Sequence, residues 1–264
     1  MMNDSPATKK SLGQHWLNDA ASLEAMCAAA QLSPDTTVLE IGPGAGSLTK
    51  LLVERAAQVV AVEFDADLAR DLPHRVPASN LDVVNQDILQ FDYTSLPAEY
   101  SVVANIPYYL TSNLIRVLSE TPNPPQTAVL LIQKEVAERV AAEPGDMSIL
   151  SVTAQLYWEV SLGREVPAEL FTPPPKVDSQ ILILRRRSEP LFANLDIKQY
   201  FRIVKAGFSQ KRKTLLNSLS GGLQLDRATV ASLCEEAKID PSRRAQTLSL
   251  EDWYWLSQVI AKHT

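Results

Sequence analysis

The tetrapeptide Asn105-Ile106-Pro107-Tyr108 directly follows a short apolar run, residues 101–104. The Asn105 side-chain oxygen and the Ile106 carbonyl oxygen are acceptors that could take the two N–H groups of an exocyclic adenine amine. Pro107 keeps Ile106 out of the helical region, so the strand must end in an extended kink. Tyr108 offers a flat face for a base removed from its stack. The tetrapeptide indicates methyl transfer to adenine, and it also fits a proline-terminated strand with a core tyrosine.

A glycine loop upstream indicates a nucleotide-cofactor site. Residues 37–41 read as a buried strand, and residues 42–46, with glycines at Gly42, Gly44 and Gly46, lead from it into a helix at residues 47–53. Glycine permits the tight turn and the close backbone approach that such a site needs. The spacing is G-x-G-x-G with a proline inside, rather than the dinucleotide pattern G-x-G-x-x-G. The loop therefore favours S-adenosyl-L-methionine over the cofactor of a dehydrogenase.

Two carboxylates follow the next two predicted strands. Residues 58–62 lead to Glu63, which could accept both hydroxyls of a ribose. Residues 81–85 lead to Asp87, which could accept from an adenine amine with Ile88 beside the ring, or could be a turn or helix-cap residue. Because the carboxyl ends of parallel strands meet at one edge of a sheet, we expect these groups to share a site with the glycine loop and Asn105.

These features resemble the ribosomal RNA adenine dimethyltransferases, specifically the small-subunit type whose loss confers kasugamycin resistance. The resemblance spans nearly the whole chain. The segments that carry it are residues 11–17, 39–44, 105–108, 133–139, 171–179, 208–215 and 244–250. Two positions differ from the commonest pattern of the family: His15 stands where asparagine is frequent, and Tyr109 follows the tetrapeptide where asparagine often does.

The resemblance implies an α/β fold, with a Rossmann-like S-adenosylmethionine-dependent methyltransferase sheet and a smaller all-α C-terminal domain. It implies methyl transfer from S-adenosyl-L-methionine to adenines of small-subunit (16S) rRNA, giving N6-dimethyladenine and coupled to maturation of the small subunit. The cofactor contacts that it implies are Gln14, His15, Leu17, Gly42, Gly44, Glu63, Asp87, Ile88 and Asn105. The residues that it implies for the target adenine are Asn105, Ile106, Pro107, Tyr108 and Phe171.

Length and composition agree with a cytoplasmic enzyme. The 264 residues suffice for one large core and a smaller domain. We expect no membrane segment, since no apolar run approaches the roughly 20 residues that cross a bilayer, and no signal peptide. Cys27 and Cys234 are expected to be buried reduced thiols. The scattered histidines give no indication of a metal site, and a monomer is expected.

The charge is unevenly distributed along the chain. The formal net charge is −6, yet residues 185–214 contain nine Lys or Arg and two acidic residues, a net charge of +7. Such a run can be a solvated face. In an acidic protein we interpret it as a surface for phosphates of small-subunit rRNA within a pre-ribosomal subunit, with Lys211, Arg212 and Lys213 as the central contacts.

Strand and helix patterns alternate from residue 37 to about residue 134 and predict a doubly wound parallel sheet. Two apolar runs, residues 151–160 and 180–184, are expected to close its edge. Helices are predicted at residues 196–208, 211–219, 226–237 and 249–261, the last opened by a capping box at Ser249 and Asp252. We therefore expect a cofactor-binding methyltransferase domain at residues 1–190 and a helical RNA- or ribosome-binding domain at residues 191–264.

Residues 171–176 form a predicted loop, because its three prolines cannot sit in a central strand. A stiff proline segment could hold Phe171 as a stacking platform, or could be a surface linker with one anchoring aromatic.

Two alternatives to an active small-subunit enzyme remain open. The chain could be an RNA-binding assembly factor or transcription-factor relative that keeps the fold without turnover, although the intact Asn105, Ile106 and Glu63 favour the enzyme. It could also belong with the large-subunit enzymes that confer macrolide resistance. The triple-proline loop and the long helical C-terminal segment look like the small-subunit type instead.

Overall fold

The structure of the chain is a computed structural model that describes residues 13–263. The chain forms two compact units. The first takes in the described residues up to Glu138 together with Trp158–Arg186, and the second takes in Arg139–Tyr157 and the residues from Arg187 onward. The division therefore differs from a single boundary near residue 190: Arg139–Tyr157, expected in the first domain, belongs to the second unit.

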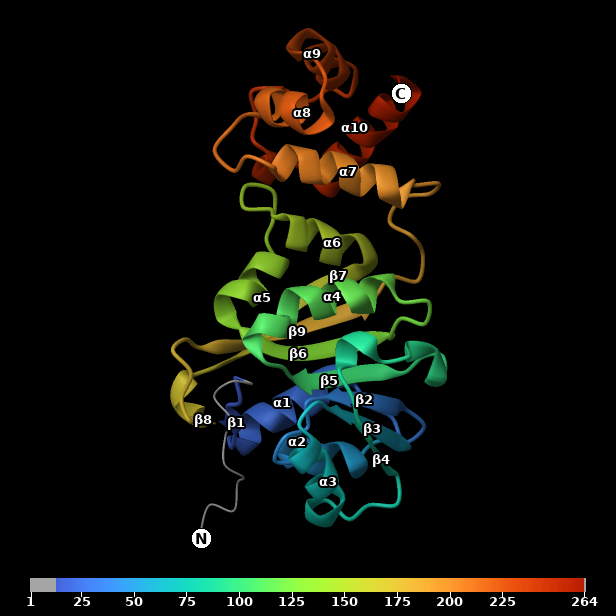
Figure 1. Cartoon of the computed structure of the whole chain (residues 1–264), viewed down its shortest axis with the longest axis vertical. Helices are drawn as coiled ribbons and strands as arrows, with labels where there is room; N and C mark the ends of the chain where they lie inside the picture. Colours follow the sequence, from blue (N-terminus) through green and yellow to red (C-terminus); the bar gives the residue numbers. More distant parts are fainter. Residues whose placement is uncertain (1–12, 264) are drawn as a thin grey trace. The chain divides into compact units, whose positions relative to one another are not determined.

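The first unit is built on a seven-stranded sheet in the order β4-β3-β2-β5-β6-β9-β7 (Figure 1). The strands are β2 (Thr37–Ile41), β3 (Gln58–Glu63), β4 (Leu81–Asn85), β5 (Ser101–Asn105), β6 (Thr127–Gln133), β7 (Trp158–Val166) and β9 (Ser179–Arg186). Strands β2 to β6 pair in parallel, whereas β9 pairs antiparallel with both β6 and β7. The predicted α/β, Rossmann-like sheet is confirmed.

Helices cover both faces of this sheet, and α1 and α4 lie on opposite sides of it (Figure 1). The helices of this part of the chain are α1 (Ala20–Ala30), α2 (Ser47–Val53), α3 (Ala66–Arg75), α4 (Thr111–Glu120) and α5 (Lys134–Val140). Aspartates begin two of them: Asp19 accepts from the Ser22 N–H at 2.8 Å, and Asp65 accepts from the Asp67 N–H at 3.1 Å. Such caps satisfy backbone donors that have no partner within the helix.

A second, two-stranded sheet joins the start of the described chain to the proline loop. Strand β1 (Trp16–Leu17) pairs antiparallel with β8 (Phe171–Thr172). The pairing puts Leu17 opposite Phe171. Both side chains are buried in the core that α1 and α2 form with the large sheet. Residues far apart in the sequence are thus held side by side.

The prediction that residues 151–160 close the edge of the sheet was wrong for residues 151–157 and correct for residues 158–160, which begin β7. Residues 149–157 form helix α6 (Ile149–Tyr157), and β7, which follows it, is the strand at that edge of the sheet. Val152 and Leu156 lie one helical turn apart, on one face. Both are buried in the core of the second unit. A short apolar run cannot be distinguished from a buried helix by its composition alone.

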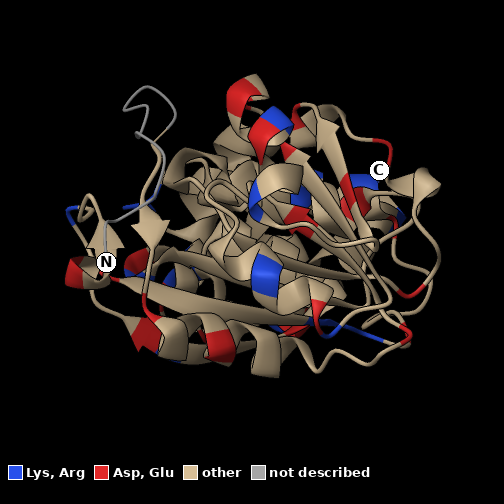
Figure 2. Ribbon diagram, turned by 90° about the horizontal axis from the view of Figure 1, so that it is seen from below, with Lys and Arg blue, Asp and Glu red and all other residues tan. Residues whose placement is uncertain are grey.

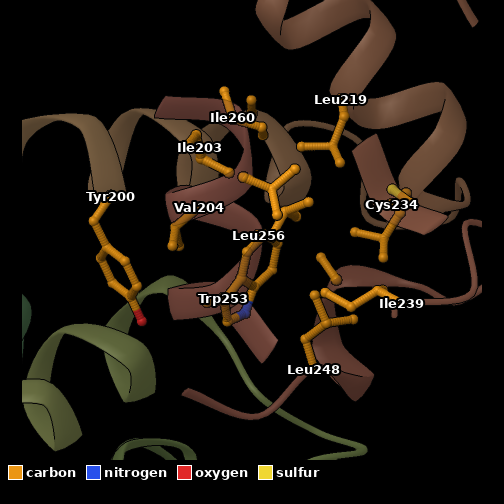
Figure 3. Packing of buried hydrophobic residues seen from close by; sticks show 14 of the residues in the cluster. Tyr200, Ile203, Val204, Leu219, Cys234, Ile239, Leu248, Trp253, Leu256 and Ile260 are labelled. Atoms are coloured by element: carbon orange, nitrogen blue, oxygen red, sulfur yellow. The ribbon is translucent and has the colours of Figure 1, made fainter. Parts of the chain in front are cut away.

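The second unit is all helical and has its own core. Besides α6 it contains α7 (Ile197–Phe208), α8 (Leu215–Leu223), α9 (Arg227–Glu236) and α10 (Leu250–His263). Trp253 lies in the middle of this core, with Leu219, Cys234 and Ile260 among the buried side chains around it (Figure 3). The capping box of α10 is confirmed, since the Asp252 N–H donates to the Ser249 hydroxyl at 3.0 Å and the Ser249 N–H donates to the Asp252 carboxylate at 3.1 Å. Cys27 and Cys234 are buried free thiols, as predicted.

Candidate active site

The parallel strands bring the predicted site residues to one edge of the sheet. Ile41 at the end of β2 pairs with Val62, and Glu63 at the end of β3 pairs with Asn85 at the end of β4. Asn105 ends β5, the neighbour of β2 on its other side. The glycine loop, Glu63, Asp87 and the tetrapeptide therefore all leave the sheet at its carboxyl edge, where open α/β sheets bind ligands.

The glycine loop brings its backbone close to a neighbouring ring. Gly44 has φ +55°, and a Cβ there would lie 2.3 Å from the Cζ3 atom of Trp16. Gly42 has φ +66° and no heavy atom within 4 Å of the position of a Cβ, so its open side faces free space. Both positions require glycine, Gly42 for its backbone conformation and Gly44 also for lack of room.

Glu63 is held in place by the loop that it faces. One carboxylate oxygen accepts from the Gly44 N–H at 3.1 Å, and the other accepts from the Asp65 N–H at 2.9 Å. Burial raises the pKa of Glu63 above its ordinary value, and these two backbone hydrogen bonds partly offset that rise. Because a carboxylate oxygen has more than one lone pair, both oxygens keep acceptor capacity for a ligand.

Glu40 is a site residue that the sequence analysis missed. It lies within β2 and is buried, with one oxygen, Oε2, that makes no hydrogen bond to a described group. Burial raises the pKa of Glu40 to about 8; the nearby Thr49 hydroxyl lowers it and the Glu63 carboxylate raises it further. The sequence does contain a clue to Glu40, namely a carboxylate within a short buried strand. A buried charge needs a partner, so such a residue is a candidate for ligand binding.

Asp87 has the structural role that the sequence left open. It caps the short 3₁₀ helix Ile88–Gln90 by accepting from the Leu89 N–H at 3.0 Å. Its carboxylate and the buried Ile88 side chain also line the same cavity as Glu63. The two interpretations of Asp87 are therefore compatible.

The tetrapeptide forms the turn between β5 and a 3₁₀ helix, Tyr108–Leu110. The Asn105 amide N–H donates to the His15 carbonyl oxygen at 3.4 Å, which orients the side-chain oxygen away from that contact. Pro107 has φ −58° and ψ 136°, the extended geometry expected of the kink. The Tyr108 hydroxyl lies 2.9 Å from the Ser179 hydroxyl, which sets the position of its ring.

The β1–β8 ribbon supplies the remaining wall. His15 Nδ1 donates to the Pro173 carbonyl oxygen at 2.7 Å, and the His15 ring stacks near that of Tyr108, with centroids 6.2 Å apart. Phe171 is buried, so it forms part of the wall rather than an exposed platform. Ser11 and Leu12, which belong to the motif at residues 11–17, lie outside the described residues.

All of these elements enclose one cavity of about 340 Å³ in the first unit. Every residue predicted to contact the cofactor or the target base lines it: Gln14, His15, Leu17, Gly42, Gly44, Glu63, Asp87, Ile88, Asn105, Ile106, Pro107, Tyr108 and Phe171. The sequence analysis missed Phe64, an aromatic residue 61% exposed that also lines the cavity directly after Glu63.

The charge of this lining distinguishes between classes of ligand. Among the described lining residues are three carboxyl groups, Glu40, Glu63 and Asp87, and no Lys or Arg. A pyrophosphate would find no cation here, whereas a ligand with an ammonium and a sulfonium group would find acidic partners. The cavity therefore fits S-adenosylmethionine better than a dinucleotide.

Within residues 13–263 no group of three or more His, Cys, Asp or Glu could hold a metal ion.

Fewer cations of residues 185–214 are available to RNA than the sequence predicted. Arg185 donates to the Ala29 carbonyl oxygen at 3.1 Å, Arg187 donates to the Gln155 carbonyl oxygen at 3.2 Å, and Arg186 lies over the Trp158 ring. These three arginines have structural contacts. Acidic residues are not confined to one segment and lie on helices as well as on loops (Figure 2). The cations left exposed are Lys198, Arg202, Lys205, Lys211, Arg212 and Lys213.

The exposed cations gather on one segment of the second unit. Lys198, Arg202 and Lys205 are spaced to share one face of α7, and Lys211–Lys213 form the turn before α8. The prediction that Lys211 begins a helix was wrong, because α8 begins at Leu215. Three successive cations are unfavourable at the positive end of a helix dipole.

No helix within residues 13–263 is long and apolar enough to cross a membrane.

Comparison with known proteins places these features in a family. The family model described as ribosomal RNA adenine dimethylase matches residues 6–262. The chain is 39% identical over 259 residues to ribosomal RNA small subunit methyltransferase A of Dehalococcoides mccartyi, which covers 97% of this chain and 89% of that protein. It is 38% identical to the protein of the same name from Bacillus cytotoxicus, over 97% of this chain and 92% of that protein.

Solved structures of other proteins resemble the fold of this chain. A dimethyladenosine transferase from Plasmodium falciparum superposes with a TM-score of 0.80 at 26% identity, over 93% of this chain and 97% of that one. The 23S rRNA methyltransferase ErmE superposes with a TM-score of 0.75 at 32% identity, over 93% and 99%. With almost its entire length matched by the family model, the chain belongs to the ribosomal RNA adenine dimethylase family.

Proposed function

We propose that the chain transfers methyl groups from S-adenosyl-L-methionine to the exocyclic amine of adenines in small-subunit (16S) rRNA, giving N6-dimethyladenine. The observation that carries this proposal is the acceptor pair of Asn105 and Ile106 in the same acidic cavity as Glu63. Relatives named as small-subunit methyltransferases, 38% to 39% identical over nearly the whole chain, support the choice of RNA. We further propose that the reaction takes place in the cytoplasm, on a maturing small subunit, and that the enzyme acts as a monomer.

The cofactor residues have distinct tasks in this proposal. Glu63, buried and facing the Gly44 N–H, would accept the ribose hydroxyls. Asp87 and Ile88 would receive the adenine end, with the carboxylate accepting from its amine. Glu40, whose buried Oε2 has no protein partner among the described residues, would face the ammonium group. Gln14, His15 and Leu17 would close the cavity from the β1 side.

The chemical step depends on acceptors rather than on a base. S-adenosylmethionine supplies an electrophilic methyl group on a positively charged sulfur. The Asn105 side-chain oxygen and the Ile106 carbonyl would accept the two N–H groups of the adenine amine, drawing the nitrogen toward a tetrahedral geometry. Tyr108 would stack on one face of the base, with Phe171 as part of the wall around it and Pro107 fixing the turn. The nitrogen becomes acidic once it has attacked, so its proton can pass to water without a general base.

The two units divide the work in this proposal. The first unit binds the cofactor and the target base, and the second binds RNA phosphates through its exposed cations, above all Lys211, Arg212 and Lys213. Such contacts position a protein on RNA without reading its sequence. Selection of the adenine is then left to the cavity.

The experiment that tests the proposal is methyl incorporation into under-methylated small subunits, with the product nucleoside identified. N6-dimethyladenosine is expected with the wild type. Asn105→Ala is expected to lower the rate by on the order of a hundredfold, because it removes one preorganised acceptor while leaving RNA affinity nearly unchanged.

Parallel assays decide between the proposal and its alternatives. The 23S rRNA, the substrate in the name of ErmE, serves as the competing substrate. Methylation of 23S rRNA alone would overturn the choice of substrate. Binding of small subunits without methyl transfer would instead identify an assembly factor that has lost turnover.

A further inference from the structure

The second tyrosine of the sequence Tyr108-Tyr109 has no role in the reaction described above. Tyr109 is 68% exposed, makes no hydrogen bond to a described residue, and still lines the cavity. Single exposed aromatic residues are common on protein surfaces. Tyr109 differs because it combines exposure with a place at the mouth of the site.

The local backbone turns the two tyrosines in different directions. Residues 108–110 form a 3₁₀ helix, in which three residues complete a turn and successive side chains diverge by about 120°. Tyr108 is half-buried and contacts Ser179, Leu110 is buried, and Tyr109 alone points to solvent. The tetrapeptide therefore ends in two aromatic faces, one within the cavity and one at its rim.

The Tyr109 ring lies near Gly13, which has no side chain. A Cβ added to Gly13 would lie 3.9 Å from both Cδ1 and Cε1 of Tyr109 and 4.0 Å from the Pro107 Cβ atom. A tyrosine side chain has only two rotatable torsions, so it loses little freedom when a ligand covers its face.

The position of Tyr109 along the edge of the sheet favours RNA over the cofactor as its ligand. The other exposed apolar residues in the lining, Phe64 and Leu89, follow Glu63 and Asp87 at the ends of β3 and β4. Tyr109 follows β5, on the opposite side of β2, where the acceptors for the adenine amine lie. It is therefore on the base side of the cavity.

We propose that Tyr109 stacks on the nucleotide next to the target adenine and is a positioning residue for RNA. This inference rests on the proposed function. An adenine that leaves its stack to enter the cavity deprives its neighbour of a stacking partner. The exposed face of Tyr109 replaces that partner, since aromatic side chains stack on any base. Tyr109 thus holds the flipped state without touching the reacting nitrogen or the cofactor.

The test combines a change in the protein with a change in the RNA. Small subunits are reconstituted with under-methylated rRNA that carries either a normal base or an abasic residue on one side of the target adenine, each side in turn. Tyr109→Ala is expected to raise KM for normal subunits roughly tenfold or more, with little change in kcat or in S-adenosylmethionine affinity. Tyr109→Phe keeps the ring and is expected to behave like the wild type.

The coupling between the two changes decides the matter. On subunits with the abasic neighbour, wild type and Tyr109→Ala are expected to have the same KM, because the stacking partner is already absent. Trp255→Ala, which removes an exposed aromatic ring from α10, is the control and is expected to show no such coupling. An equal effect of Tyr109→Ala on both substrates, or a Tyr109→Phe variant as impaired as Tyr109→Ala, would overturn the proposal. Failure of the proposed function is a separate result, namely no N6-methylation of normal subunits by the wild type.

Discussion

The Tyr108 hydroxyl lies 2.9 Å from the hydroxyl of Ser179, a residue 71 positions later in the chain. Ser179 is 1% exposed and begins β9, where it pairs with Gln133 of β6 on one side and with Val166 of β7 on the other. The last ring of the tetrapeptide is therefore tied to a rigid point of the antiparallel part of the sheet. This hydrogen bond links the segment at residues 171–179 to the tetrapeptide in physical terms.

Ser179→Ala is expected to lower kcat for methyl transfer roughly tenfold while leaving S-adenosylmethionine affinity unchanged. The physical reason is that the Tyr108 ring is no longer held by its hydroxyl, because small errors in the position of a bound reactant lower rates steeply. Tyr108→Phe removes the same hydrogen bond from the other side. The double variant is therefore expected to be no slower than the slower single variant when the three are compared in steady-state kinetics.

Ser119→Ala provides the matched control. Ser119 is a buried serine of α4 whose hydroxyl accepts from the Trp158 Nε1–H at 2.8 Å, and it does not line the cavity. Its loss is expected to cost about 1 to 3 kcal/mol of stability, since it leaves a buried donor unpaired, with kcat of the folded enzyme unchanged. If Ser179→Ala lowers stability in the same way and spares kcat, Ser179 has only a structural role.

Glu63→Ala is expected to weaken S-adenosylmethionine binding roughly tenfold to a hundredfold, because it removes charged hydrogen bonds worth about 1.5 to 3 kcal/mol. The carboxylate also accepts from the Gly44 N–H, so its removal frees a donor of the glycine loop. Calorimetric titration of the folded variant measures the effect. Glu63→Gln keeps one acceptor oxygen, so its affinity for S-adenosylmethionine is expected to lie between those of the wild type and Glu63→Ala. An unchanged dissociation constant for Glu63→Ala would remove the residue from the site.

Glu40 is expected to make the stability of the ligand-free protein fall as the pH rises from about 4.5 to about 8. The pKa of Glu40 is raised to about 8 in the folded state from an ordinary value of 4.5, chiefly by burial. Within that window the folded state binds more protons than the unfolded state, so the free energy of unfolding decreases with pH. The change is on the order of a few kcal/mol, at about 1.4 kcal/mol for each pKa unit.

Urea unfolding at pH 6 and pH 8, compared for the wild type and two variants, tests this expectation. Glu40→Gln cannot ionise and is expected to lose most of the decrease. Glu54→Gln changes an exposed carboxylate just after α2 and is expected to keep the wild-type dependence. A decrease of the same size in Glu40→Gln would mean that another group titrates in this window.

The sequence predicted the site better than it predicted the helical unit, for a physical reason. Gly42, Gly44, Glu63, Asp87 and Asn105 stand at or just after the ends of parallel strands, and parallel pairing necessarily brings those ends to one edge. The residues of the β1–β8 ribbon were predicted only from the family resemblance: Gln14, His15, Leu17 and Phe171. The strand at residues 37–41 and the helix at residues 47–53 therefore suffice to place Gly42 and Gly44. Glu40 was missed because strand periodicity treats a buried carboxylate as an interruption rather than as part of a site.

Features that depend on long-range packing could not be predicted. Helix α6 exists because Val152 and Leu156 pack against residues from beyond position 200, which no local pattern reveals. The hydrogen bond between Tyr108 and Ser179 likewise depends on the position of β9 between β6 and β7. The structural roles of Arg185 and Arg187 rest on hydrogen bonds to Ala29 and Gln155, so a count of charges overstated the surface available to RNA.

Charge reversal of Lys211, Arg212 and Lys213 to Glu is expected to weaken binding of small subunits and to flatten its salt dependence. These residues are exposed in the turn before α8, so the protein core does not hold them in ion pairs that reversal would break. For each RNA phosphate that is no longer neutralised, the slope of log affinity against log salt should become shallower by about 0.7 to 0.9. Binding measured at several salt concentrations gives the slope, and S-adenosylmethionine affinity should remain unchanged because the cavity lies wholly in the first unit.

The control for this last variant reverses three exposed cations of the first unit, Lys50, Arg70 and Arg116, which do not line the cavity. It makes the same change in net charge, so a general repulsion between an acidic protein and RNA would lower affinity equally in both variants. A specific phosphate surface predicts a larger decrease in affinity and a flatter slope for the 211–213 variant alone. Native affinity and native slope in that variant would leave the turn without a role in RNA binding, and Lys198, Arg202 and Lys205 on α7 would then be the cations to reverse next.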